Sequence, residues 1–545
     1  MKGKARFTAL GINILLLVSS SVLFTLAHPN RLIHTGLPLL AYAIFIPFFL
    51  LVRRISFFSS LLWGGLFGAL NYCLFGYWLL VFHPLALYII AFEYFVYYSI
   101  TVLLLKLADI YFPQHGFIVQ WLIWIGYEYI RTLGFLGFSY GLIGYSQWSC
   151  IPIIQIASLF GVWAVSALVV FPSAWIAAAF KQYCTKPIRY WKQGAFDFAR
   201  AHWLSAALWL VCFCSTVLFG VLSPKTYDTL PQRKIALIQP NTDPWVGGTA
   251  AYKKDLALLK KLSDEALRAH PDISLVVWPE TAFVPRIDWH YRYREDREAF
   301  EIVYELLHYL NDKTVPFLIG NDDAVNAAVD IGIEDRLDYN AALLFRPRQN
   351  VLPPSPERYR KMHLVPFTEH FPYKKQFPFV YALLEASDTH FWAKGEDPHV
   401  FAVDDLVFSV PICFEDTFGY LTRKFAQQGA RLIVNMSNDA WSKSVPCQYQ
   451  HLSMAVFRAV ENRLPMVRAT ASGQTAAVSP HGRVSALLEP FVQGYLCVTV
   501  PVYAENPKTL YTRWGDWFAL LFTAAAVLFL CVGTLRYFIW KGKVR

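Results

Sequence analysis

Charged residues are scarce in this chain. They make up 16% of its 545 residues, whereas hydrophobic residues make up 55% and aromatic residues 17%. The mean hydropathy of +0.35 is high, because an ordinary soluble chain carries more charge and fewer apolar side chains. The composition therefore excludes a typical soluble protein and makes membrane-spanning helices the first feature to look for.

Several kinds of site are also missing from the sequence. No cluster of cysteine and histidine has the spacing of a zinc site, and there is no HExxH motif. The sequence has no internal repeat, no coiled-coil pattern and no glycine-rich phosphate loop. We therefore expect neither a metal nor a cofactor. The net charge of +10 does not indicate nucleic-acid binding, because much of it lies in short loops between apolar segments.

Long apolar runs lie at the two ends of the chain. A helix needs about 20 apolar residues to cross a bilayer. Eight segments are predicted to do so, namely 7–27, 37–52, 55–82, 85–107, 117–130, 157–180, 204–222 and 517–540. This pattern predicts a seven-span region at 1–222, a separate domain at 223–514, and a final span with its tail at 515–545.

Lysine and arginine predict the orientation of these spans. They collect before the first span, after the second, between the sixth and seventh, and after the last. Those loops share one side if seven spans precede the large domain, so both termini are expected in the cytoplasm and the domain outside. The first span could instead be a cleaved signal peptide, since "TLA" before His28 resembles a weak cleavage site.

The large domain alternates short apolar runs with amphipathic ones. Runs typical of strands include "KIALIQPN", "ISLVVWPE", "VPFLIGND", "NAALLFRP", "LVFSVPICFE", "RLIVNMSND" and "PMVRATASG". Helical patterns cover about 252–269, 297–310, 418–428 and 450–463. Repeated alternation of strand and helix predicts a layered α/β domain.

Three polar residues stand at or beside the ends of apolar runs, where α/β domains place their sites. They are Glu280, Lys361 and Cys413. Taken singly, each has a simpler interpretation: a surface carboxylate, a solvated lysine and a packed, inert thiol. Together they supply an acid/base, a cation and a nucleophile. The thiol also needs an explanation because the large domain has an odd number of cysteines, with Cys447 and Cys497 as the others.

The motifs around these residues resemble the nitrilase superfamily. They are "WPET" with Glu280, "KMHLVPFTEHFP" with Lys361 and Glu369, and "ICFED" with Cys413. The fuller resemblance is to bacterial apolipoprotein N-acyltransferases, which also have seven spans, an exported nitrilase-like domain and a final span. "SNDAW", "QYQHLSMAVFRAVENRLPMVRAT" and, in the membrane region, "EYIRTLGFLGFSYGLIGYSQ" are similar to motifs of that family. The resemblance implies a membrane helical bundle plus an αββα sandwich.

The resemblance also implies roles for particular residues. Glu280 would act as general base, Lys361 would stabilise the oxyanion and Cys413 would carry the acyl group. Glu369 would orient Lys361 or the incoming amine. Phe414 and Glu415 adjoin the nucleophile, and the resemblance implies that they take part in function without specifying how. Trp245 matches a tryptophan of the family's pocket only loosely, so an ordinary core or loop tryptophan is an equal alternative.

The resemblance implies an acyl donor and an acceptor as partners. The donor would be a membrane phospholipid, and the acceptor the free amino group of a diacylated apolipoprotein, with a thioester on Cys413 between them. The expected location is the bacterial cytoplasmic (inner) membrane, with the domain on the periplasmic side. Two alternatives remain open, a membrane-anchored amidase that uses water, and a lipid-binding or transport protein with an inactive domain.

Some positions depart from the family's pattern or stay open. "WSKS" at 441–444 and "TASG" at 470–473 differ from its usual runs, so the shape of the substrate pocket is not predicted. Glu128 and Arg131 lie three residues apart near the end of the fifth apolar segment. They could contact a lipid head group, or they could be a charge pair or side chains that reach the interface.

Overall fold

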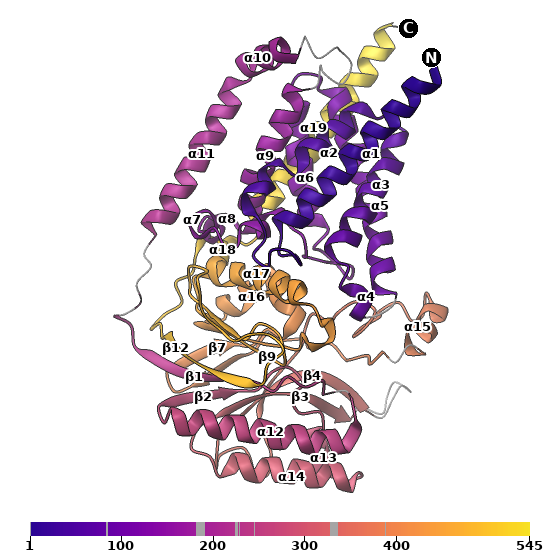
Figure 1. Ribbon diagram of the computed structural model, residues 1–545. Helices are drawn as coiled ribbons and strands as arrows, with labels where there is room; N and C mark the ends of the chain where they lie inside the picture. Colours follow the sequence, from indigo (N-terminus) through magenta and orange to yellow (C-terminus); the bar gives the residue numbers. More distant parts are fainter. Residues whose placement is uncertain are drawn as a thin grey trace. The chain divides into compact units, whose positions relative to one another are not determined.

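The computed structural model of the chain describes residues 2–82, 85–180, 191–223, 227, 229–244, 246–326, 336–386 and 389–544. These residues divide into two units (Figure 1). The helical unit comprises Met1–Ser223, Ser444–Phe457 and Trp514–Arg545, and the α/β unit comprises Pro224–Lys443 and Arg458–Arg513.

Each of the eight predicted apolar segments contains a helix. The main helices are α1 (Lys2–Ala27), α2 (Phe45–Arg54), α3 (Ser59–Phe75), α5 (Ala86–Tyr111), α6 (Gly116–Ile130), α9 (Val162–Ala179), α11 (Trp203–Leu222) and α19 (Trp517–Val544). Shorter helices join them, namely α4 (Leu79–Phe82), α7 (Ile151–Ile154), α8 (Ala157–Phe160), α10 (Trp191–Ala201) and α18 (Leu510–Trp514).

Five of these helices are long and apolar enough to cross a membrane, over Thr8–Ala27, Ala86–Tyr111, Val162–Ala179, Trp203–Leu222 and Trp517–Trp540. This number is smaller than the eight predicted spans, because α2, α3 and α6 have only 10, 17 and 15 residues. The predicted span at 157–180 is also divided, since Gly161 adopts a φ of +70° between α8 and α9. The described chain therefore has a membrane helical region with five candidate spans of full length.

Close backbone contact joins α3 to α5 within this unit. A β-carbon on Gly68 would lie 2.2 Å from the carbonyl oxygen of Tyr94, so only glycine fits there. Small residues allow this approach where helices pack inside a membrane, because dispersion contacts rather than the hydrophobic effect hold them together. α5 packs the buried Tyr94 and Tyr98 against Tyr72 and Phe67 of α3.

The α/β unit contains two sheets of six strands. The first has the order β12 (Gly494–Pro501), β1 (Gln232–Gln239), β2 (Ile273–Val277), β3 (Phe317–Asn326), β4 (Arg336–Phe345) and β5 (Glu357–Arg360). The second has the order β11 (Val484–Leu487), β10 (Ala476–Val478), β9 (Met466–Thr470), β8 (Leu432–Ser437), β7 (Leu406–Ser409) and β6 (Val400–Val403). The central three strands of each sheet pair in parallel and the outer pairs are antiparallel.

Helices cover the outer faces of the two sheets (Figure 1). α12 (Gly248–Ala269) and α14 (Arg297–Asn311) bury leucines, isoleucines and valines against β1 to β4. α16 (Gly419–Gln427) and the end of α17 (Val445–Asn462) lie beside the second sheet. Two smaller helices, α13 (Ile287–Tyr293) and α15 (Pro378–Glu385), lie in connections. The predicted αββα sandwich is confirmed, and it brings residues distant in sequence to one end of the sheets.

Candidate active site

The three predicted catalytic residues follow strands of the α/β unit. Glu280 comes three residues after β2, and Lys361 directly follows β5 in the same sheet. Cys413 follows β7 of the other sheet and opens a 3-10 helix, Cys413–Thr417. Its φ of +50° lies in the left-handed region, which costs a non-glycine residue of order 1–3 kcal/mol and recurs at functional sites. Parallel strands thus present the acid and the thiol from two facing sheets.

Both carboxylate oxygens of Glu280 accept hydrogen bonds. Oε1 accepts from the ammonium of Lys361 at 3.1 Å and from Asn340 Nδ2 at 2.8 Å. Oε2 accepts from the backbone N–H of Asn438 at 2.8 Å. The side chain is buried, with a relative exposure of 5%. A carboxylate fixed by three donors has one orientation, which a proton acceptor at this site would need.

The ammonium of Lys361 is fully buried between two carboxylates. Nζ donates to Glu280 as described and to Glu369 Oε1 at 2.8 Å. Burial lowers the pKa of this ammonium, but Glu280 and Glu369 outweigh burial, and its pKa stands well above the ordinary value. Lys361 therefore stays positively charged, as a group that stabilises an oxyanion must.

The thiol of Cys413 is half-buried. Burial raises its pKa well above the ordinary value and Glu280 adds to the rise, whereas Lys361 and the Ser437 hydroxyl lower it. The resting group is therefore a neutral thiol. A thiol in this state needs a base to become a nucleophile, and Glu280 is the carboxylate whose charge acts on it most strongly.

Glu369 and Glu415 support the site in different ways. Glu369 binds Lys361 through Oε1, while its Oε2 accepts from the N–H of Val365 at 2.8 Å. Glu415 is fully buried and does not touch the ammonium. Its Oε1 accepts from the N–H groups of Met362 and His363 at 2.7 and 2.9 Å, and its Oε2 from that of Ile412 at 2.8 Å. Glu415 therefore ties the segment after Lys361 to the segment before Cys413.

Two of the remaining predictions concern aromatic residues. The ring of Phe414 packs edge-on against Phe418, and His363 stacks on Phe418 with centroids 3.9 Å apart. Burial lowers the pKa of His363 to about 3, with Lys394 and Lys361 adding to the effect, so this imidazole is neutral. Trp245 lies outside the described residues.

Three residues at the site had not been predicted. Asn340 on β4 holds Glu280, and the Tyr359 hydroxyl donates to both oxygens of Glu415 at 2.8 and 2.9 Å. Gly320 on β3 passes beside the backbone of Glu280. Asparagine and glycine are unfavourable inside strands, so their positions within "VPFLIGND" and "NAALLFRP" were a usable signal.

Among the described residues, no group of three or more His, Cys, Asp or Glu could hold a metal ion. The chemistry available at the site is that of a thiol, a carboxylate base and a buried cation. This set can form and break a thioester, because it supplies the nucleophile, the proton acceptor and the oxyanion's counter-charge.

The chain is similar to two known protein families and to solved structures. The family described as carbon-nitrogen hydrolase matches residues 234–505, and the apolipoprotein N-acyltransferase N-terminal domain matches residues 20–175. Among solved structures, Saccharomyces cerevisiae Nit3 of the nitrilase superfamily is 17% identical, with a TM-score of 0.36, over 53% of this chain and 96% of that chain. Residues 234–505 thus form a carbon-nitrogen hydrolase domain.

Two curated relatives cover the whole molecule. Apolipoprotein N-acyltransferase 1 of Treponema denticola is 46% identical over 99% of this chain and 100% of its own length. The protein with the same name from Treponema pallidum is 50% identical over 96% of each chain. The chain belongs to the apolipoprotein N-acyltransferase family.

Proposed function

We propose that this chain moves an acyl chain from a membrane phospholipid to the N-terminal amino group of a diacylated apolipoprotein, through a thioester on Cys413. The observation that carries the proposal is the pair of bonds from the buried ammonium of Lys361 to Glu280 and Glu369. The pKa of the Cys413 thiol responds to both Glu280 and Lys361, which puts all three groups in one electrostatic environment.

In the first half-reaction, Sγ of Cys413 attacks the carbonyl carbon of the phospholipid ester while Glu280 takes the thiol proton. Lys361 balances the negative charge that develops on the carbonyl oxygen. The bond from carbon to the glycerol oxygen then breaks, Glu280 returns the proton to that oxygen, and lysophospholipid leaves. The products of this step are one thioester and one alcohol.

In the second half-reaction, the neutral amine of the acceptor attacks the thioester carbon. The carbon–sulfur bond breaks, the amine loses a proton to Glu280, and the proton passes to the sulfur of Cys413. An amide forms and the thiol is restored. The enzyme therefore binds its two substrates in turn, and lysophospholipid leaves before the amine attacks the thioester.

A membrane region suits both substrates. A long acyl chain has on the order of 15 methylenes at about 0.8 kcal/mol each, so it prefers lipid to water by roughly 12 kcal/mol. A chain with several apolar helices of spanning length can meet such substrates without extracting them. We place the chain in the bacterial cytoplasmic membrane, with the catalytic domain on the outer side.

Mass spectrometry of the purified full-length protein tests the proposal. With phospholipid alone, we expect one acyl chain on Cys413 and an equal amount of lysophospholipid. Addition of a diacylated lipopeptide should move the chain to the peptide's amine. Cys413→Ser should form no thioester, whereas the matched variants Cys447→Ser and Cys497→Ser should behave as the wild type. Acylation of another residue, or release of free fatty acid at the same rate without peptide, would contradict the proposal.

A further inference from the structure

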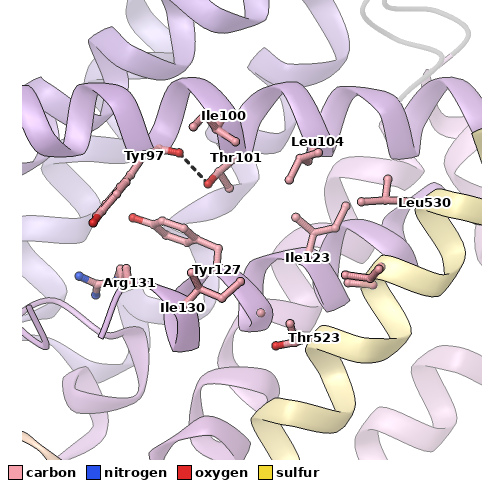
Figure 2. Close-up of a pocket in the computed structure, with 13 residues that line it drawn as sticks. Tyr97, Ile100, Thr101, Leu104, Ile123, Tyr127, Ile130, Arg131, Thr523 and Leu530 are labelled. Carbon is pink, nitrogen blue, oxygen red and sulfur yellow. Dashed lines mark hydrogen bonds between the residues drawn. The ribbon is translucent and has the colours of Figure 1, made fainter. Parts of the chain in front are cut away.

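A groove lies among three helices of the helical unit, with a volume of about 290 Å³ (Figure 2). α5 contributes residues from Tyr97 to Leu104, and α19 contributes residues from Thr523 to Leu530. α6 and the residue after it contribute residues from Ile123 to Arg131. Each of these stretches covers seven residue steps or slightly more, so the groove is about 10 Å long at 1.5 Å per residue. Its side chains belong to the helical unit alone, whereas the triad belongs to the α/β unit.

The floor of the groove depends on a glycine. Gly126 of α6 faces α19, and a β-carbon there would lie 3.3 Å from Cα of Thr523. Ile100, Ile130 and Val527 stand on the rim, with relative exposures of 53%, 56% and 56%. α5 and α19 are long and apolar enough to cross a membrane, so in a bilayer these exposed apolar side chains would face hydrocarbon rather than water.

The two ends of the groove differ in polarity. Figure 2 shows Tyr97, Tyr127 and Arg131 at one end. It shows Leu104, Ile123 and Leu530 toward the other. In the predicted topology the polar end is the outer one, since α6 runs outward and Arg131 directly follows it. A polar end and an apolar body match the ester end and the tail of a lipid.

Arg131 is buried, with a relative exposure of 3%, yet its hydrogen-bonding capacity is not used up. Its hydrogen bonds, to the hydroxyls of Tyr72 and Tyr94 and to two backbone carbonyls, all involve Nη1. The buried Nε has no partner, and neither has the hydroxyl of Tyr127. Unsatisfied donors in this position are costly without an acceptor, because no water is available in hydrocarbon.

The nearby carboxylates do not supply that acceptor. Glu128 accepts from the N–H of Ile143 at 2.9 Å and from Trp124, and no ion pair joins it to Arg131 in the described chain. Glu93 likewise forms no ion pair with Arg131 in that part of the chain. Of the arrangements predicted for Glu128 and Arg131, a direct ion pair is not found among the described residues, and both side chains are buried, with relative exposures of 1% and 3%.

We infer that this groove binds one acyl chain of a membrane phospholipid, with the ester oxygens of the lipid at Tyr127 and Arg131. The ester carbonyl is an acceptor without a proton, so it complements donors that have no other partner. The ester is also neutral. A neutral group suits this site better than an anion, because the nearby carboxylates would repel a negative charge. The site goes beyond the proposed reaction, because none of its residues belongs to the triad.

Photochemical crosslinking tests this inference. The full-length protein in lipid nanodiscs receives a phospholipid that carries a diazirine in the middle of one acyl chain, and labelled peptides are mapped by mass spectrometry. We expect labelling concentrated on α19 around Thr523–Leu530 and on α6. Val527→Trp should fill the groove and lower this labelling at least threefold. Leu528→Trp is the matched control, because Leu528 is 62% exposed and does not line the groove.

A second pair of variants keeps the test valid if Val527→Trp fails to fold. Ile100→Trp closes the groove from α5, and Val96→Trp is its control on the same helix.

Tyr127→Phe removes one donor and should weaken labelling by the ester lipid by about fivefold, as expected for one hydrogen bond. Equal labelling of groove and control variants, or labelling spread evenly over α1 and α11, would overturn the inference. The result does not depend on turnover, since labelling is equally expected in Cys413→Ala.

Discussion

A β-carbon added to Gly320 would lie 2.7 Å from Cα of Glu280 and 2.2 Å from the carbonyl oxygen of Pro279. β3 therefore approaches the segment after β2 more closely than any side chain permits. The backbone that carries the proposed base rests directly on the neighbouring strand.

Gly320→Ala should displace Glu280 and lower kcat on the order of 10²-fold, because misplacement of a catalytic group by about 1 Å costs that much. Gly494→Ala on β12 is the control, since a β-carbon there would meet only Leu488 at 3.6 Å. Both variants should be assayed for transfer to a lipopeptide after gel filtration. Full activity in folded Gly320→Ala would show that Glu280 does not depend on this contact.

Asn340 should position Glu280 by donating a hydrogen bond, not by filling space. Asn340→Asp retains the shape but cannot donate, and it adds a negative charge beside Glu280 at neutral pH. Asn340→Leu also removes the donor, but it adds no charge beside Glu280. We therefore expect about a tenfold loss of kcat in Asn340→Leu and a larger loss in Asn340→Asp, in line with the cost of an unsatisfied buried charge. The reverse order would indicate a packing role.

Lys361→Met should lower kcat on the order of 10²- to 10³-fold, as expected when one oxyanion donor is lost. The thermal transition should also fall, because Glu280 and Glu369 lose their shared buried partner. Lys375→Met is the control, since that side chain is exposed. Near-normal turnover in folded Lys361→Met would remove Lys361 from the mechanism.

Glu415 should make the stability of the α/β unit depend on pH. Burial raises the pKa of Glu415 from 4.5 to about 7, although the N–H groups of Ile412 and His363 oppose the rise. The folded state then holds the proton more tightly than the unfolded state. The stabilisation is complete below pH 4.5 and is lost as the pH rises through about 7.

Glu415→Gln tests this dependence, because glutamine does not titrate. The thermal transition of the wild type should fall between pH 4.5 and pH 7 by more than that of Glu415→Gln. Burial also raises the pKa of Asp322, to about 8, but this residue is present in both proteins and its effect on stability cancels in the comparison. Parallel pH profiles for the two proteins would show that Glu415 keeps its charge throughout.

The predicted topology has its own test. Reporter fusions at Lys313, in the large domain, and at Lys186, in the basic loop between the sixth and seventh predicted spans, should report opposite sides of the membrane. An extracytoplasmic signal at Lys313 and a cytoplasmic signal at Lys186 are expected. The same signal at both positions would contradict an odd number of spans before the domain.

Much of the fold follows from local pattern. The seven apolar runs in the large domain all contain strands, because buried central strands need apolar side chains on both faces. β5, β6, β10, β11 and β12 were not predicted. The first four have only three or four residues each, whereas β12 has eight. Span lengths were overestimated where Gly161 and the short α2 interrupt apolar sequence, because hydropathy does not report backbone geometry.

The same difference between local pattern and long-range contacts applies to the residues of the site. Short continuous motifs contain four of the predicted site residues, so the sequence alone indicates them. They are Glu280, Lys361, Cys413 and Glu369. Asn340 and Gly320 act on Glu280 across strand neighbours, 60 and 40 residues further along the chain. Such contacts depend on sheet order and register, which a single sequence does not specify.

Glu415 binds backbone N–H groups on both the Lys361 and the Cys413 sides of the site, and all of these groups belong to the α/β unit. These bonds within the α/β unit help to set the spacing of cation and sulfur. Changes in bilayer thickness or fluidity should then alter how often substrates arrive, while the rate of the chemical steps in a loaded enzyme stays constant. Lipid composition would change the rate at which substrates reach the site of this enzyme and would leave its catalytic geometry unchanged.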